Sequence, residues 1–174
     1  MFAGIAAGGH GAVRLFAAVA MAVAFTGCSP SMDTRSPSPS PSPIPTLSDA
    51  AVASEVVELH AFFQAWFRGE LAADDAAFAP LAQALGPGFV IISPSGTAMS
   101  RAAVLDGVRG AHGSWGPDDR IWIDAVTIRH RDAETVVATY EEWQRRGGDE
   151  RGRVSTVVFS ADGVWLHLQE TWLP

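Results

Sequence analysis

The chain's hydrophobic pattern is helical in its first folded segment. Apolar residues recur every three or four positions from Val52 to Phe67, polar capping candidates precede them at 46–49, and Gly69 ends the pattern. A shorter pattern of the same kind follows Asp74 and stops at Gly86. We expect a third helix over 101–111, capped by Ser100 and with its valines facing inward.

The pattern then changes to alternation, which predicts strands. A strand is expected over 89–93, between turns at Gly86-Pro87-Gly88 and Pro94-Ser95-Gly96. Beyond Pro117 the period is two, and four strands are expected, over 120–130, 135–145, 153–160 and 164–173. The links between these four are short and turn-rich, which favours antiparallel hairpins. The predicted fold class is α+β, with three helices packed on one face of a strongly curved, mainly antiparallel sheet.

The last strand carries the clearest sequence motif. Residues 165–172 read Trp-Leu-His-Leu-Gln-Glu-Thr-Trp, which resembles the closing strand of SnoaL-like domains at Trp165, Leu168 and Trp172. Segments 140–144 and 153–156 are similar to an uncharacterised bacterial subgroup of the same superfamily. The resemblance is to the nuclear transport factor 2-like superfamily, also called cystatin-like or SnoaL-like, and it covers 48–174.

That resemblance implies a cone-shaped domain with an internal cavity. The superfamily includes isomerases, dehydratases, cyclases, transport adaptors and pure binders, so the fold alone does not name an activity. Alignment with SnoaL-like domains places Trp165, His167 and Gln169 on the cavity side of the last strand. Members of the superfamily often form dimers through the outer face of the sheet, which implies a possible homodimer here.

The amino-terminal segment has the layout of a bacterial lipoprotein signal. Arg14 precedes an apolar run over 15–25, which is too short to span a bilayer, and small residues lead to Cys28. We therefore predict a signal peptide over 1–27, a lipid on Cys28, a Pro/Ser stalk over 28–45 and the folded domain over 46–174. The predicted protein is exported and anchored through this lipid to the membrane of the cell envelope.

Composition excludes several classes of site. The formal net charge of −7 disfavours nucleic acid as a partner. Cys28 is the chain's only cysteine, and no two histidines of the folded domain have metal-ligand spacing, so we expect no metal site. The domain also lacks a glycine-rich cofactor loop, and no cofactor is expected.

The candidate site residues are polar and aromatic. Glu141 and Glu142 are adjacent and point to opposite faces of their strand, so the two cannot act together as an acid/base pair. The sequence leaves open which face is inward, although Tyr140 and Glu142 would form a coherent polar group there. Each candidate also has a structural alternative, as a core residue or part of a dimer interface. The candidate ligand pocket comprises His60, Trp66, Trp122, Tyr140, Glu142, Trp143, Trp165, His167 and Gln169.

Three functions remain at this point. The first is an exported lipoprotein whose cavity binds a small apolar or amphipathic molecule. The second is a cofactor-free isomerase, dehydratase or cyclase, with Glu142 as the base and Tyr140 or His167 as the hydrogen-bond donor. The third is a dimeric structural or adaptor module that associates through the outer face of the sheet.

Overall fold

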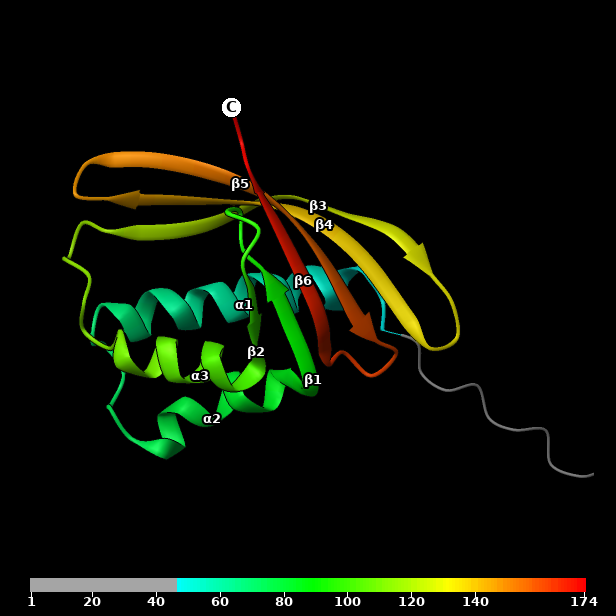
Figure 1. Ribbon diagram of the computed structural model, residues 1–174, viewed down its shortest axis with the longest axis horizontal. Coiled ribbons are helices and arrows are strands. Elements are labelled where there is room, and N and C mark those ends of the chain that lie inside the picture. Colours follow the sequence, from blue (N-terminus) through cyan, green and yellow to red (C-terminus); the bar gives the residue numbers. More distant parts are fainter. Residues whose placement is uncertain (1–46) are drawn as a thin grey trace, which may run out of the picture. The chain divides into compact units, whose positions relative to one another are not determined.

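The computed structural model describes residues 47–174, and within them it contains three helices and six strands (Figure 1). The predicted signal peptide, Cys28 and the stalk lie outside the described residues. The elements follow one another as α1 (Asp49–Phe67), α2 (Asp75–Ala84), β1 (Leu85–Ile92), β2 (Ala98–Ser100), α3 (Arg101–Gly110), β3 (Arg120–Arg131), β4 (Thr135–Arg146), β5 (Asp149–Ser160) and β6 (Trp165–Trp172).

Each helix begins at a side-chain cap. Ser48 accepts a hydrogen bond from the backbone N–H of Ala51, and Asp74 accepts one from Ala77. Ser100 caps α3 in the same way. A cap satisfies backbone donors that have no partner within the helix, so the three predicted helices begin where the sequence places these groups.

The strands form one mixed sheet in the order β2-β1-β6-β5-β4-β3. The predicted hairpins β3–β4, β4–β5 and β5–β6 are confirmed as antiparallel, whereas β1 pairs in parallel with β6. The sequence did not predict that parallel pairing, because it joins segments that are distant along the chain.

Two predicted boundaries are wrong. The expected turn at Gly86-Pro87-Gly88 lies inside β1, where the pairing with β6 shifts register between Leu85 and Val90. Strand β5 begins at Asp149 rather than at 153, because Gly147 and Gly148 alone make the turn after β4. Their φ angles of 57° and 95° belong to the left-handed region that tight hairpins require.

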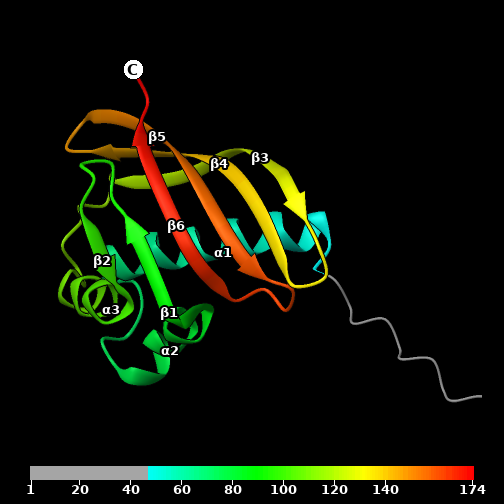
Figure 2. The same cartoon turned by 45° about the vertical axis from the view of Figure 1, so that its right-hand side comes forward.

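All three helices cover one face of the curved sheet (Figure 2). Apolar residues of α1 and α2 pack against the central strands, with Val52, Val56 and Leu81 fully buried beside Val136 and Val157. No residue of α3 is buried to that degree. The predicted α+β class is confirmed. Among the helices of the described part, none is long and apolar enough to cross a membrane.

Candidate functional site

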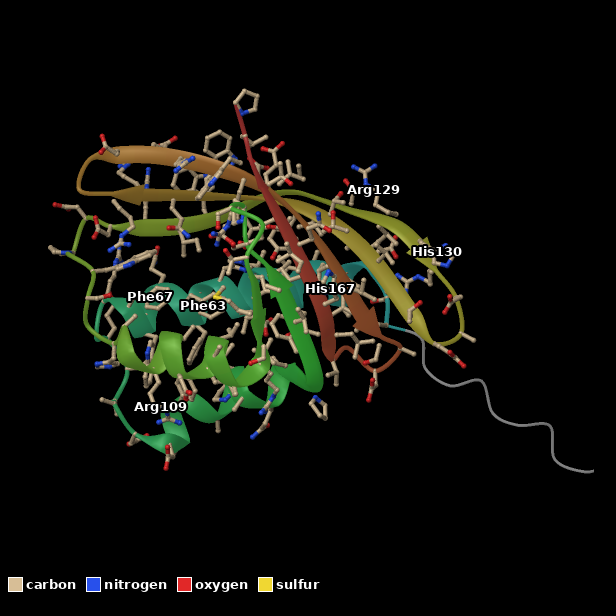
Figure 3. All side chains as sticks on the ribbon, viewed as in Figure 1. Phe63, Phe67, Arg109, Arg129, His130 and His167 are labelled. Atoms are coloured by element: carbon tan, nitrogen blue, oxygen red, sulfur yellow. The ribbon has the colours of Figure 1, made fainter. Side chains whose placement is uncertain are left out.

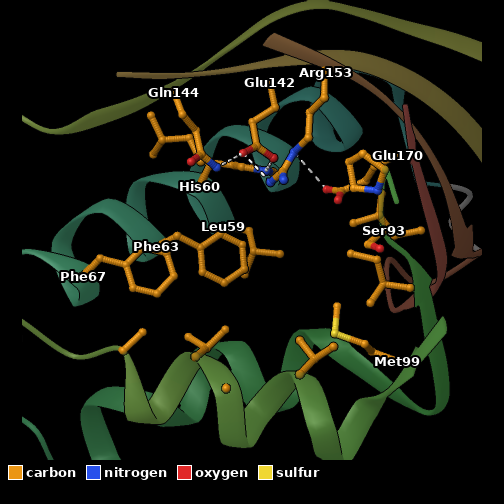
Figure 4. Close-up of a pocket in the computed structure, with 18 of the residues that line it drawn as sticks. Leu59, His60, Phe63, Phe67, Ser93, Met99, Glu142, Gln144, Arg153 and Glu170 are labelled. Carbon is orange, nitrogen blue, oxygen red and sulfur yellow. Dashed lines mark hydrogen bonds and ion pairs between the residues drawn. The ribbon is translucent and has the colours of Figure 1, made fainter. Parts of the chain in front are cut away.

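A cavity of about 460 Å³ lies between α1, α3 and the concave face of the sheet. One side carries the rings of Phe63 and Phe67, which project from α1 (Figures 3 and 4). The ring of Trp115 also lines the cavity, with its centroid 5.0 Å from that of Phe67. Val104 and Val108 of α3 line the opposite side, as their predicted inward orientation implies. The walls are therefore largely apolar, and polar groups are concentrated beneath the sheet.

The polar end of the cavity comes from one face of three neighbouring strands. Tyr140 and Glu142 lie on the inward face of β4, and Glu142 is directly opposite Arg153 of β5. On the next strand, Glu170 is opposite Ser155 and so shares that face. Strand register thus brings Arg153 and Glu170, which are 11 and 28 positions beyond Glu142 in the chain, to the same face as Glu142.

We call His60, Glu142, Arg153 and Glu170 the buried polar cluster (Figure 4). Arg153 Nη2 donates to Glu142 Oε1 over 2.5 Å, and its Nε lies 3.1 Å from Glu170 Oε1. Gln144 Nε2 donates to Glu142 Oε1 over 2.6 Å. One guanidinium therefore lies between two carboxylates, both of which are almost completely buried.

His60 completes the cluster from the helix side. Its Nε2 lies 3.1 Å from Glu142 Oε2, and its Nδ1 lies 2.6 Å from the carbonyl oxygen of Val56. The carbonyl can only accept, so Nδ1 carries a proton and donates it. These two contacts fix the imidazole between α1 and the sheet.

The two carboxylates have opposite pKa shifts. Burial opposes ionisation of Glu142, but hydrogen bonds and charge from His60 and Arg153 outweigh it and hold the pKa of Glu142 at about 2. Burial raises the pKa of Glu170 to about 7, against the attraction of Arg153 and with repulsion from Glu142. Burial lowers the pKa of Arg153, yet the two carboxylates outweigh it and raise that pKa overall. At neutral pH the cluster holds one fixed carboxylate and one that titrates.

Several buried polar atoms in this region have no hydrogen-bond partner within residues 47–174. They are the Tyr140 hydroxyl, Arg153 Nε and Ser155 Oγ. Arg153 Nε is close to Glu170, but the contact is between charges and lacks hydrogen-bond alignment. Burial and the nearby carboxylates raise the pKa of Tyr140 far above its usual value, so its hydroxyl stays protonated and able to donate.

The structure brings four of the predicted pocket residues to the cavity wall. Tyr140, Glu142, His60 and Trp165 all line it. Trp165 is also held from α1, since its Nε1 donates to Glu55 Oε1 over 2.9 Å.

The predicted inward face of the last strand is wrong beyond Trp165. His167 and Gln169 lie on the face of β6 opposite Leu168 and Glu170, and neither lines the cavity. The reason is a bulge, because β6 shifts register against β5 between Val158 and Phe159. One extra residue exchanges the two faces, so Trp165 and Glu170 both point inward.

The other predicted tryptophans also lie outside the cavity wall. Trp66 is a buried core residue whose Nε1 donates to the carbonyl oxygen of Val108 over 2.7 Å. Trp122 and Trp143 stack on each other with ring centroids 6.3 Å apart. Trp143 alternates with Glu142 along β4 and therefore lies on the other face of the sheet. The sequence could not distinguish a buried core position from the outer face of the sheet, since tryptophan occurs in both.

Arg153, Glu170 and Gln144 also belong to the site, although the sequence did not single them out. A buried carboxylate needs a cationic partner, and this requirement was the available signal for Arg153. A two-residue turn at Gly147 and Gly148 would have placed Arg153 opposite Glu142. Glu170 was missed because the bulge that turns it inward leaves no sequence mark. Within residues 47–174, no three His, Cys, Asp or Glu side chains gather in the manner of a metal site.

Comparison with known families decides the classification. A sequence model of the family described as "Sucrose-6-phosphate phosphohydrolase C-terminal" matches residues 52–174. The chain belongs to the sucrose-6-phosphate phosphohydrolase C-terminal family. The match covers nearly all of the described domain, including every member of the buried polar cluster.

Curated plant relatives carry the corresponding name. The chain is 35% identical over 123 residues to probable sucrose-phosphatase 2 of Arabidopsis thaliana, covering 68% of this chain and 29% of the relative. It is 28% identical to sucrose-phosphatase 2 of Nicotiana tabacum, covering 94% of this chain and 40% of that protein. The chain thus spans less than half the length of these relatives.

Solved structures confirm the resemblance to the nuclear transport factor 2-like superfamily. An NTF-2-like protein of unknown function from Pseudomonas aeruginosa matches with a TM-score of 0.62 and 26% identity, covering 70% of this chain and 98% of that one. A protein with a cystatin-like fold from Caulobacter vibrioides matches with a TM-score of 0.50 and 14% identity, covering 73% and 92% of the two chains. The second likeness concerns the fold alone.

These findings correct the functional prediction. The predicted function, capture of a small apolar or amphipathic molecule, is wrong, because the family and its relatives name a phosphatase, which is a hydrolase. The same finding replaces the two alternative functions. Lipid attachment at Cys28 and association through the outer face of the sheet are not tested by it and stay predictions.

Proposed function

We propose that this domain binds the sugar in the reaction from which its family takes its name, the hydrolysis of sucrose 6-phosphate. The family match over residues 52–174 and the sucrose-phosphatase relatives support this assignment. The chain corresponds to less than half the length of those relatives. We therefore assign sugar binding to this domain, and the phosphatase chemistry to the part of the relatives that this chain does not match.

The lining of the cavity has the two kinds of surface that a sugar needs. A pyranose or furanose ring presents apolar C–H faces, and Phe63, Phe67 and Trp115 offer aromatic surface for them. Its hydroxyl groups both donate and accept, and Gln144 with the buried polar cluster offers partners of both kinds. A volume of about 460 Å³ lies within the range of small-molecule sites.

The proposal rests above all on the environment of the Tyr140 hydroxyl. This hydroxyl is buried in the cavity-lining part of β4, and although the Ser155 hydroxyl opposite is close enough to affect its pKa, the two form no hydrogen bond of normal geometry. Buried hydroxyls are normally hydrogen-bonded, and leaving one unpaired is costly. A hydroxylated ligand supplies this bond, whereas a purely apolar ligand does not. The charges of the cluster are paired with one another, which suits a neutral ligand.

The test is isothermal titration calorimetry of the full chain with sucrose. We expect saturable binding in the wild type, and no release of phosphate when the chain alone is incubated with sucrose 6-phosphate. Absence of sucrose binding would overturn the proposal. Turnover of sucrose 6-phosphate by the purified chain would overturn the claim that this domain binds the sugar without hydrolysing the phosphate ester.

Two glutamines provide a matched pair of variants. Gln144 lines the cavity, whereas Gln169 is exposed on the opposite face of the sheet. We expect Gln144→Leu to weaken sucrose binding by about fivefold to tenfold, the worth of one hydrogen bond, while Gln169→Leu leaves it unchanged. Equal effects from the two variants would count against a sugar in this cavity.

A further inference from the structure

A second hollow adjoins the cavity toward the turn between β4 and β5. Its volume is about 260 Å³. Glu142, Gln144, Arg146 and Arg153 line both spaces, so the hollow continues from the polar end of the cavity. A ligand seated in the cavity can therefore extend a substituent into the hollow without crossing the core.

Two arginines of the β4–β5 hairpin, Arg146 and Arg151, line this hollow. Gln144 of β4 is paired with Arg151 of β5, and Arg146 is paired with Asp149. Arg146 and Arg151 are therefore diagonal neighbours on the same face of the hairpin, within reach of one shared ligand. We call them the hairpin arginines.

Aromatic rings hold the hairpin arginines in place. The guanidinium carbon of Arg151 lies 3.5 Å from the centre of the Trp172 ring, and that of Arg146 lies 5.1 Å from the Trp115 ring. Stacking on a ring orients the planar guanidinium and leaves its N–H edge available for an acceptor. The arrangement restrains these side chains without using their hydrogen-bonding capacity.

Neither hairpin arginine has an acidic oxygen within 4 Å among the described residues. The neighbouring Arg145 differs, because it pairs with Glu150 over 3.4 Å. Asp119 is close enough to Arg146 for their charges to interact. Its carboxylate oxygens, however, accept hydrogen bonds from the backbone N–H groups of Gly116 and Gly147. Asp149 also lines the hollow, and it is outnumbered there by the arginines.

We propose that the hairpin arginines bind the phosphate group of a sugar phosphate whose sugar occupies the main cavity. This inference rests on the proposed function and gives the ligand an orientation. A phosphate dianion accepts paired N–H bonds from a guanidinium edge, so two such edges on one face suit it. Arg153 at the cavity's inner end is already paired with Glu142 and Glu170, whereas the hairpin arginines have no acidic partner among the described residues, so the phosphate points outward to the hairpin.

The experiment compares sucrose with sucrose 6-phosphate by calorimetry on the full chain. We expect the wild type to bind the phosphorylated sugar at least tenfold more tightly, with a preference that declines as salt is added. Arg151→Gln should reduce that affinity about fivefold and leave the affinity for sucrose unchanged, because Arg151 lines the hollow and not the main cavity. Arg146→Gln should also reduce the affinity for sucrose 6-phosphate about fivefold. Arg145→Gln, on the other face of β4, should change neither value.

The possible outcomes separate this inference from the proposed function. Equal affinities for the two sugars, or a preference that survives both arginine substitutions, would overturn the phosphate site while sucrose binding stands. If sucrose does not bind, the proposed function fails, and a titration with inorganic phosphate followed by ³¹P NMR decides the phosphate site by itself. Binding of phosphate that Arg151→Gln removes would support the site, and no binding would overturn it. Thermal unfolding of each variant verifies that the fold is intact.

Discussion

The buried polar cluster and the hairpin arginines lie on the same face of β4 and β5, yet they stabilise their charges differently. In the cluster, Arg153 contacts two carboxylates that are shielded from water. Two residues away, Arg151 stacks on Trp172 and has no acidic partner among the described residues. Burial makes an unpaired charge costly, while exposure makes it tolerable. The same residue type is therefore structural at 153 and available to a ligand at 151.

The largest expected effect comes from breaking the cluster. Arg153→Met leaves Glu142 and Glu170 buried without a guanidinium, which should lower the free energy of unfolding by about 3–5 kcal/mol at pH 7. Urea unfolding followed by tryptophan fluorescence measures this. Arg151→Met is the control on the same face, and its effect should stay within about 0.5 kcal/mol. Similar losses in both variants would erase the distinction between the two regions.

The titration of Glu170 gives the next largest effect. Its pKa of about 7 in the folded state is above the ordinary value of 4.5, so the folded protein binds this proton more tightly than the unfolded chain. Stability from this group is fully present below pH 4.5 and falls as the pH rises through 7, by about 3 kcal/mol. Glu170→Gln should flatten this dependence, measured by urea unfolding between pH 4.5 and 8.

Glu142 determines how stability changes at the acidic end of the same pH profile. Its folded-state pKa of about 2 is below the ordinary 4.5, so its contribution is present above pH 4.5 and is lost as the pH falls toward 2. In the wild type, stability should therefore peak near pH 4.5 to 5. A profile that rises steadily from pH 4.5 to 8 would contradict the assignment of Glu170.

A smaller effect distinguishes ligand binding from stability at Tyr140. Tyr140→Phe removes a hydroxyl that has no protein partner in the described region, so the free energy of unfolding should not fall and should rise by up to about 1 kcal/mol. Sucrose affinity should nevertheless fall by about fivefold, because the ligand loses one hydrogen bond. Chemical unfolding and calorimetry on the same preparation give both values. A loss of stability without loss of affinity would mean that the hydroxyl serves the fold.

The smallest effect concerns the aromatic support of the hairpin arginines. Trp172→Leu removes the ring on which Arg151 stacks and should weaken binding of sucrose 6-phosphate by about threefold, since a partly exposed cation–π contact is worth about 0.5–1 kcal/mol. Calorimetry with sucrose 6-phosphate and with sucrose measures it. Affinity for sucrose should not change, and an equal loss for both sugars would place Trp172 in the wall of the sugar site instead.

Local sequence rules predicted most of the architecture. The caps at Ser48, Asp74 and Ser100 and the change of period after Pro117 placed every helix and the meander of strands. The site was only partly accessible in the same way. Glu142 and Tyr140 were named, but the choice of their face depended on a chemical preference rather than on a pattern.

The sequence by itself determined the helices, the hairpins and the α+β class, because caps, turns and periodicity act over a few residues. Only the tertiary structure decided which polar groups meet. The bulge in β6 exchanged His167 and Gln169 for Glu170, and the register of β4 with β5 brought Arg153 to Glu142. A single-residue shift in pairing reverses the face of every later side chain, and such a shift depends on packing between strands rather than on local preference.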